Sequence, residues 1–170
     1  MKKSNFRKLL SMTVAVSALS MLLATGAGAE SYAADNTSTS SAVIEPGALT
    51  PPPPTEFSPL SISGNYQYLA AGNATISAIG NGQLRINADT SAKSSVDTIK
   101  AYVSLQRYTG TNWVDVSNTT FSKNNTDFVV GDALFTGVKA FYYRVACTHS
   151  INKGGLYEQS IEYSDFVLAY

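Results

Sequence analysis

The sequence predicts an all-β protein, an antiparallel β-sandwich preceded by an export signal and a disordered linker. Three observations favour this class. Apolar and polar residues alternate with a period of two over much of residues 60–170, glycine and asparagine turns separate the alternating runs, and no window shows the 3.6-residue period of a helix. Several short alternating strands joined by such turns are typical of a β-sandwich.

The first element, residues 1–29, has the three parts of a secretory signal peptide. A basic start that includes Lys2 and Arg7 is followed by an apolar run over 9–24 and by the small residues 27–29. We expect cleavage after Ala29 and a secreted, extracellular protein. A retained membrane anchor is the alternative, but the apolar run is short for a span, which needs about 20 residues.

Residues 30–59 read as a linker rich in Ser, Thr, Ala and Pro, without helical or strand periodicity. Such a stretch buries too little apolar surface to offset its ordering entropy, so we expect disorder. Pro51–Pro54 is predicted to form a short, stiff polyproline II spacer. A ligand for a proline-recognising domain is the alternative interpretation.

The charge balance restricts the partners of the exported chain. The sequence has 12 basic and 12 acidic residues, and four of the basic ones lie within the first eight positions. After signal cleavage the chain carries a net charge of about −4, which disfavours nucleic acid and anionic membrane surfaces as partners. The single cysteine excludes an internal disulfide, so stability must come from the packed core of residues 60–170.

The strands of this domain are predicted in chain order. Residues 73–79 and 83–88 should form a hairpin across Gly80-Asn81-Gly82. Residues 98–108 follow, with every second side chain directed inward: Ile99, Ala101, Val103 and Leu105. Shorter runs at 113–116 and 126–130 come next, then a strand over 140–149, and residues 154–170 close the domain.

The strand over 140–149 contains Cys147 and His149, the only cysteine and the only histidine. In its register Phe141, Tyr143, Val145 and Cys147 share the more apolar face, so the thiol should be buried and protonated. His149 is expected in the loop that follows. We therefore predict no catalytic residues and a protein that is not an enzyme, with an exported hydrolase as a remote alternative.

No metal or cofactor is predicted. One Cys and one His fall short of a tetrahedral site. Asp127 and Asp132, with Asn124 and Asn125 nearby, could offer oxygen ligands to calcium, but their spacing is typical of hairpin turns.

The segments "LQRYTGTNWVDV" and "FYYRVACTHSINKGG" followed by "EYSDFVLAY" resemble the second half of a fibronectin type III domain, over about residues 96–170. The whole pattern is similar to a group of small exported proteins of Gram-positive bacteria of unassigned function, so the resemblance implies fold and compartment and no reaction. Type III domains place a tyrosine at the head of the penultimate strand, a position that falls on Phe141. Either Tyr142 takes that role with a shift of one residue, or the tyrosine corner is absent.

Tyrosines are abundant in the domain and suggest a binding surface. In a type III topology the strands of Tyr102 and Tyr142 are neighbours, so we expect one outward face to display the following side chains: Tyr102, Gln106, Tyr108, Tyr142 and Arg144. Tyr and Arg are typical of binding hot spots. The alternative is that these rings only support the sheet, as expected for Tyr108 and Trp113 facing each other across "TGTN".

The sequence thus predicts a secreted, non-catalytic module that binds an extracellular protein, a cell-wall glycan or copies of itself. The alternative, from a different class, is a structural subunit of an extracellular matrix or spore-associated layer that assembles by strand addition.

Overall fold

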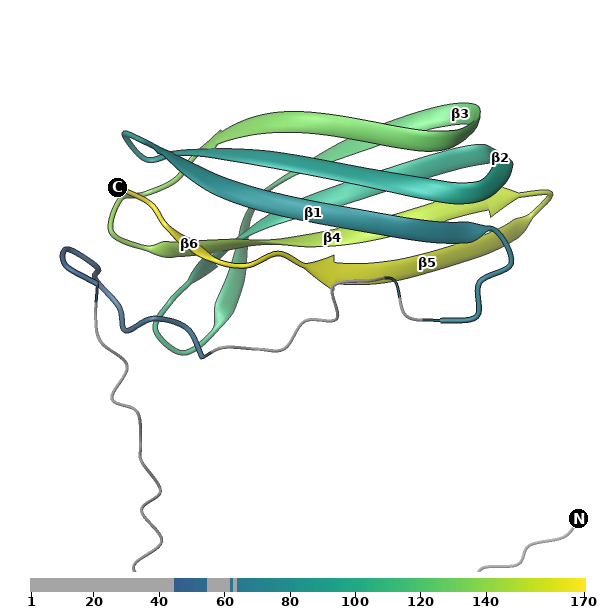
Figure 1. Cartoon of the computed structure of the whole chain (residues 1–170). Helices are drawn as coiled ribbons and strands as arrows, with labels where there is room; N and C mark the ends of the chain where they lie inside the picture. The colour runs from purple at the N-terminus through teal and green to yellow at the C-terminus, as the bar shows by residue number, and fades with distance from the viewer. Residues whose placement is uncertain (1–44, 55–61, 63) are drawn as a thin grey trace, which may run out of the picture. The chain divides into compact units, whose positions relative to one another are not determined.

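The computed structural model describes residues 45–54, 62 and 64–170 (Figure 1). The described residues form β-strands, all paired antiparallel, and no helix, which confirms the all-β prediction. Accordingly, these ranges hold no helix of a length and apolarity suited to crossing a membrane. The predicted signal peptide, residues 1–29, lies outside the described residues, as do residues 30–44 and 55–59 of the linker.

The sheet is built around β2, which pairs with three other strands. In chain order the strands are β1 (Leu69–Gly80), β2 (Gln83–Tyr108), β3 (Trp113–Thr136), β4 (Tyr142–Lys153), β5 (Leu156–Tyr163) and β6 (Val167–Leu168). The pairing order is β1–β2–β4–β5, with β3 also on β2 and β6 also on β4. The separate strands predicted for 83–88 and 98–108, and for 113–116 and 126–130, are therefore two continuous strands.

β2 is one continuous strand because an irregularity in its middle bends it without ending it. Its first half pairs with β1 and with the second half of β3, and its second half pairs with β4 and with the first half of β3. A shift in the β2–β3 register between Ser91 and Val96 separates the two halves. A bulge of this kind bends both strands without ending them, so each strand serves two parts of the fold.

The predicted β1–β2 hairpin is confirmed. Gly80 pairs with Gln83, which leaves Asn81 and Gly82 as a two-residue loop with φ angles of 54° and 73°. Positive φ at both central residues is the requirement of a type I′ turn, and Asn-Gly satisfies it at the lowest steric cost.

The core lies between the two halves of β2. One cluster of buried side chains includes Leu84 and Ile86 from the first half, Val103 and Leu105 from the second half, and Val145 from β4. The predicted inward set, Ile99, Ala101, Val103 and Leu105, is at most 1% exposed, which confirms the register. β1 accordingly contacts β4 and β5 across the core without pairing with them (Figure 1).

A tyrosine hydroxyl fixes the chain just before β4, and it belongs to Tyr143. Its oxygen accepts a hydrogen bond from the Val138 amide at 2.7 Å, and the hydroxyl donates to the Val138 carbonyl at 3.3 Å. Gly137 lies under the ring, where an added Cβ would be 2.8 Å from the ring carbon Cζ. The sequence predicts that Tyr142 makes such a contact or that no tyrosine does; in the structure the contact is made by the next residue, Tyr143.

Part of the predicted linker packs on the domain. The Leu49 amide donates to the Ala140 carbonyl at 2.8 Å, and the side chain of Thr50 is only 8% exposed. The expectation of disorder is therefore wrong for Glu45–Pro54. Composition measures what a segment can bury within itself, whereas this segment lies against a surface that the domain supplies.

Candidate functional site

Cys147 lies in the core, as its strand register predicts. Its side chain is 0% exposed. Burial, reinforced by the nearby charges of Glu162 and Asp89, raises the pKa of the thiol to about 12. Since the thiolate is the nucleophilic form, this sulfur is unreactive at neutral pH.

His149 is not a loop residue, and that prediction is wrong. It lies within β4 and is 0% exposed, because β4 continues to Lys153 before the chain turns at Gly154 and Gly155. Its Nδ1 lies 2.8 Å from the Thr90 hydroxyl and 3.8 Å from the Cys147 sulfur. Gly72 of β1 makes room for the ring, since an added Cβ there would approach it to 2.4 Å.

The charge state of this cluster follows from its burial. Loss of solvent lowers the pKa of His149 to about 4, against a small opposing effect of the Asp89 backbone, so the ring is neutral at pH 7. Its Nε2 lies 3.8 Å from Glu162, whose own pKa is raised by burial and by the charge of Asp89. Within the described residues, neither Nε2 nor the Glu162 Oε1 has a hydrogen-bond partner.

The thiol, imidazole and carboxyl groups are thus near one another, but the arrangement does not suit nucleophilic catalysis. A working thiol needs a lowered pKa and access for substrate, and both Cys147 and His149 are fully buried. In the described part of the chain, no group of three His, Cys, Asp or Glu side chains is placed to hold a metal ion. Asp132, considered above for calcium, instead lies 3.6 Å from the Arg85 guanidinium.

The strand pairing expected for the predicted binding surface is present. β2 and β4 are neighbours, with Tyr102 opposite Thr148 and Gln106 opposite Arg144. Tyr102 is 42% exposed on the outward side of β2. These residues therefore share one face of the sheet formed by the second half of β2, β4 and β5, which we call the outer face.

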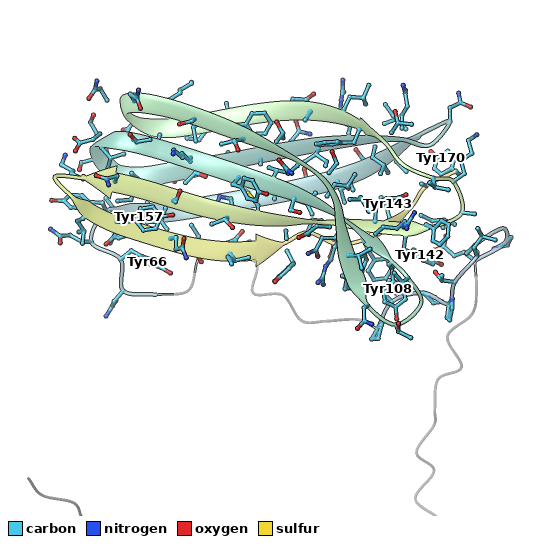
Figure 2. All side chains as sticks on the ribbon, turned by 180° about the vertical axis from the view of Figure 1, so that it is seen from behind. Tyr66, Tyr108, Tyr142, Tyr143, Tyr157 and Tyr170 are labelled. Carbon is cyan, nitrogen blue, oxygen red and sulfur yellow. The ribbon has the colours of Figure 1, made fainter. Side chains whose placement is uncertain are left out.

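Two of the five expected residues are not on the surface. Tyr108 is 6% exposed, and its ring lies 5.1 Å from that of Trp113. Tyr142 is 0% exposed, and Phe166 packs edge-on against its ring at 5.6 Å. Burial and the charge of Glu45 raise the pKa of its hydroxyl, against a lowering by the Glu45 backbone. The expectation that Tyr142 is open to a partner is wrong, whereas Tyr108 faces Trp113, as the alternative of a supporting ring pair predicts. Figure 2 shows them together at one end of the molecule, away from Tyr157.

Arg144 and Gln106 belong to a polar network at that end of the outer face. The Arg144 guanidinium lies between two rings, 4.4 Å from the centroid of Trp113 and 4.3 Å from that of Tyr163. Its Nε donates to the Gln106 side-chain oxygen at 2.8 Å, and Gln106 donates to Asp115 at 2.9 Å. Hydrogen bonds from Gln106 and Ser104 lower the pKa of Asp115. The network holds Arg144 in place as a support for the Tyr163 ring.

Sequence reasoning missed the residues that β5 contributes. Tyr157, Ile161 and Tyr163 are 57%, 53% and 40% exposed, and they alternate along β5 on the outer face. Ile161 pairs with Thr148, which pairs with Tyr102, so these three side chains form one row across the sheet. The alternation in "LYEQSIEY" is readable in the sequence, but the β4–β5 register needed to place it beside Tyr102 is not.

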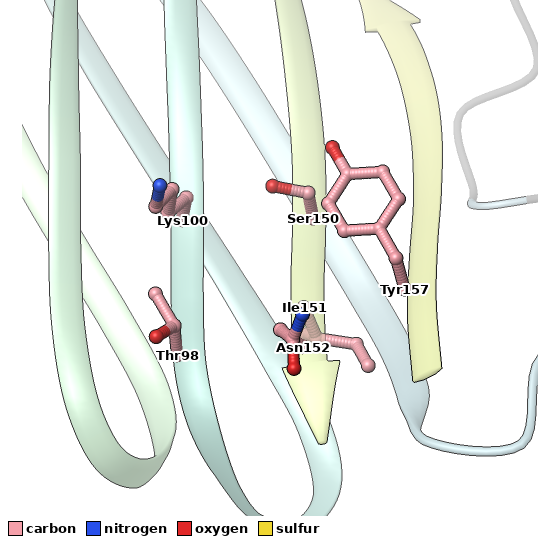
Figure 3. A pocket seen from close by; sticks show the side chains of 6 residues that line it. All are labelled: Thr98, Lys100, Ser150, Ile151, Asn152 and Tyr157. Carbon is pink, nitrogen blue, oxygen red and sulfur yellow. The ribbon is translucent and has the colours of Figure 1, made fainter. Parts of the chain in front are cut away.

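A shallow pocket of about 210 Å³ lies at the end of the outer face opposite to Arg144 and Gln106. Figure 3 shows its lining from three strands: Thr98 and Lys100 from β2, Ser150, Ile151 and Asn152 from β4, and Tyr157 from β5. The lining offers hydroxyl and amide groups, one ammonium group and one aromatic ring. Such a mixture suits reversible binding of a polar molecule.

Comparison with known proteins finds no match for this chain among protein-family models, curated proteins or solved structures.

Proposed function

We propose that the protein is a non-catalytic binding module, exported from the cell, whose binding site is the outer face. One observation carries the proposal: four large side chains, Tyr102, Tyr157, Ile161 and Tyr163, are 40–57% exposed on a single face. Exposed apolar and aromatic side chains gathered on one face are typical of an interaction site, and tyrosine adds a large contact area with few rotatable bonds.

The fold supports assignment to the immunoglobulin-like and fibronectin type III-like β-sandwiches. Counting each half of β2 and β3 separately, β1 groups with the first half of β2 and the second half of β3. The other halves group with β4 and β5. The two-residue β6, which pairs with β4, is an additional member of the second group. Without it, groups of three and four strands around one core match the architecture of a seven-strand sandwich. The hydroxyl of Tyr143, bonded to the backbone just upstream near the start of β4, fits the tyrosine corner of these domains.

The compartment and the absence of chemistry belong to the same proposal. The basic start, apolar run and small residues of positions 1–29 support export. A thiol and an imidazole that are both buried and uncharged at neutral pH support a role without catalysis. The partner then lies outside the cell, as an extracellular protein or a cell-wall glycan.

The test is binding of the purified protein to a washed envelope fraction of the producing cells, measured by co-sedimentation. The double variant Tyr102→Ser/Ile161→Ser should lose at least about tenfold in affinity, the loss of one or two hot-spot residues. The matched control, Val130→Ser/Leu134→Ser, removes exposed apolar side chains outside the outer face and should bind normally. Equal binding by both double variants would contradict the proposal.

A second candidate function, self-assembly by strand addition, is favoured by β3. In the described part of the chain β3 pairs only with β2, so its other edge is open along Trp113–Thr136. Phe128, Val130 and Leu134 are 43–55% exposed on this strand. An open edge with exposed apolar side chains is a template for pairing with another copy. Light scattering that rises with concentration, and falls in Val130→Ser/Leu134→Ser, would favour assembly over binding of a foreign partner.

A further inference from the structure

The pocket at the end of the outer face points to a class of partner. We propose that it binds an acid-bearing sugar unit of an extracellular polysaccharide, with Lys100 contacting the acid group and Tyr157 the sugar ring. The inference rests on the proposed function, because it names the ligand of the same outer face. It is carried by the chemistry of the lining, the charges around it and the side chains that continue from it along β4.

The lining suits a polyol better than an apolar group. Thr98 offers a hydroxyl group and Asn152 an amide group, and each can donate and accept hydrogen bonds. Ser150 also lines the pocket, but it is only 6% exposed. Tyr157, 57% exposed, presents a ring on which the C–H face of a sugar can stack. A protein partner would be expected to seek a desolvated apolar centre, whereas the three β4 positions that face outward next to the pocket are polar: Thr148, Ser150 and Asn152.

The charges near the pocket favour an acidic ligand. Lys100 is the only charged residue in the lining, and among the described residues no carboxylate lies within ion-pair distance of it. Two acids close by in the sequence are engaged elsewhere. Asp97 accepts a hydrogen bond from the Gly154 amide at 2.7 Å, and Glu158 accepts from the amides of Tyr68 and Leu69 at 2.9 and 2.7 Å.

Glu158 shows how fully one of these charges is compensated. Burial alone would raise its pKa, but hydrogen bonds from three consecutive amides, those of Leu69, Tyr68 and Gln67, together with the charge of Lys93, hold it below the usual value. The carboxylate is therefore ionised but satisfied within the fold. The ammonium group of Lys100 is left as the dominant charge facing the pocket, and an ammonium is a good partner for carboxylate or phosphate.

The pocket has room for about one sugar unit, so a longer ligand would need contacts beyond it. At about 210 Å³ it is smaller than the roughly 300–1,000 Å³ of sites that enclose a drug-sized ligand. Further contacts are available along β4, where the outward residues after Ser150 toward the strand start are Thr148 and Ala146. Thr148 lies between Tyr102 on β2 and Ile161 on β5, and Ala146 lies between Ser104 on β2 and Tyr163 on β5. The exposed larger side chains therefore flank a track for neighbouring sugar units.

The test is a titration of the full chain with three defined probes, followed by NMR or fluorescence: a galacturonic acid tetramer, a neutral galactose tetramer and a sugar phosphate. We expect one or both acid-bearing probes to bind more tightly than the neutral tetramer, and the difference to shrink when salt is raised to about 0.5 M, where charges are screened. The identity of the preferred acid-bearing probe would distinguish a carboxylate from a phosphate source.

The variants locate the contact. Lys100→Met should lower the affinity for the acid-bearing probe about threefold to fivefold, the range expected for one solvent-exposed ion pair. Lys100→Arg should restore that affinity. Lys123→Met, at an exposed lysine of β3 outside the pocket, is the matched control. Equal affinity for neutral and acidic probes, or an unchanged affinity in Lys100→Met, would overturn the inference. If the envelope fraction still binds through Tyr102 and Ile161 while none of the three probes does, the binding module stands and its ligand is not an acidic glycan.

Discussion

Acidification should destabilise this protein between pH 6.5 and about pH 4, and His149 should be the main cause. Its pKa is lowered from 6.5 to about 4 by burial. Between these pH values His149 is therefore protonated in the unfolded chain and neutral in the folded chain. The stabilising contribution is therefore complete above pH 6.5 and is lost as the pH falls to about 4. A shift of this size corresponds to at most about 3 kcal/mol, at 1.36 kcal/mol per pKa unit.

A neighbour of His149 reduces the loss of stability expected on acidification. Glu162, across from it on β5, has a raised pKa, so its contribution is present at low pH and is lost as the pH rises through its folded pKa. It therefore offsets part of the loss caused by His149. Asp89 and Thr90 on β2 and Cys147 on β4 complete the set of polar neighbours. We expect a net loss of about 1–3 kcal/mol on acidification.

The assay is denaturant-induced unfolding at pH 7, 5.5 and 4, followed by tryptophan fluorescence and circular dichroism. The chain has one tryptophan, Trp113, so the signal has a single source. The variant His149→Asn keeps a polar group near Thr90 and cannot titrate, so it should start less stable and show a smaller slope over the same interval. A wild-type stability that is flat from pH 7 to pH 4, or the same slope in both proteins, would refute the reasoning.

Three further predictions test the burial of Cys147, Tyr142 and His149. Cys147 should resist thiol reagents at neutral pH and react at the rate of unfolding, because its pKa of about 12 and its full burial keep it protonated and inaccessible; fast labelling of the native protein would revive a catalytic role. Tyr142→Ser should lower stability by about 3–5 kcal/mol, as for other large buried rings, whereas Tyr102→Ser should change it by less than about 1 kcal/mol. Thermal unfolding compares the two, and equal effects would be evidence against the assigned burial. Gly72→Ala should lower the melting temperature by several degrees, because the new Cβ would lie 2.4 Å from the His149 ring; a neutral result would mean that β1 and β4 are not so closely packed.

The alternation of side chains predicts the parts of this fold that depend on one strand at a time. Val103 and Leu105 are inward because each second residue of β2 is apolar, and the Asn81-Gly82 turn follows from the positive φ angles that a two-residue hairpin loop requires. The burial of Cys147 follows in the same way. These features are local, so the sequence of a single segment contains the necessary information.

The errors occur where a residue is covered by a distant segment. Tyr142 points outward from β4, as its parity predicts, yet it is 0% exposed, with Phe166 packed edge-on against its ring and Glu45 near enough to affect the pKa of its hydroxyl. The polar residues after His149 predict a strand end there, whereas β4 continues for four more residues paired with β2 and β5. Contacts of this kind depend on tertiary packing, which alternation within one strand does not report.

The two sides of β4 have different surroundings. One side buries Cys147 and His149 in the core, and the other side forms part of the outer face. Its inward residues include Cys147 and His149, and the alternation that buries them directs Ala146, Thr148 and Ser150 to the outer face. A shift of the register by one residue would exchange the two sets, exposing the thiol and imidazole and burying polar side chains. Because Gly72, Thr90 and Glu162 all fit the present placement of His149, that register is strongly specified. The same packing that buries the thiol therefore holds the small outward residues of β4 between β2 and β5, on the face that we propose for binding.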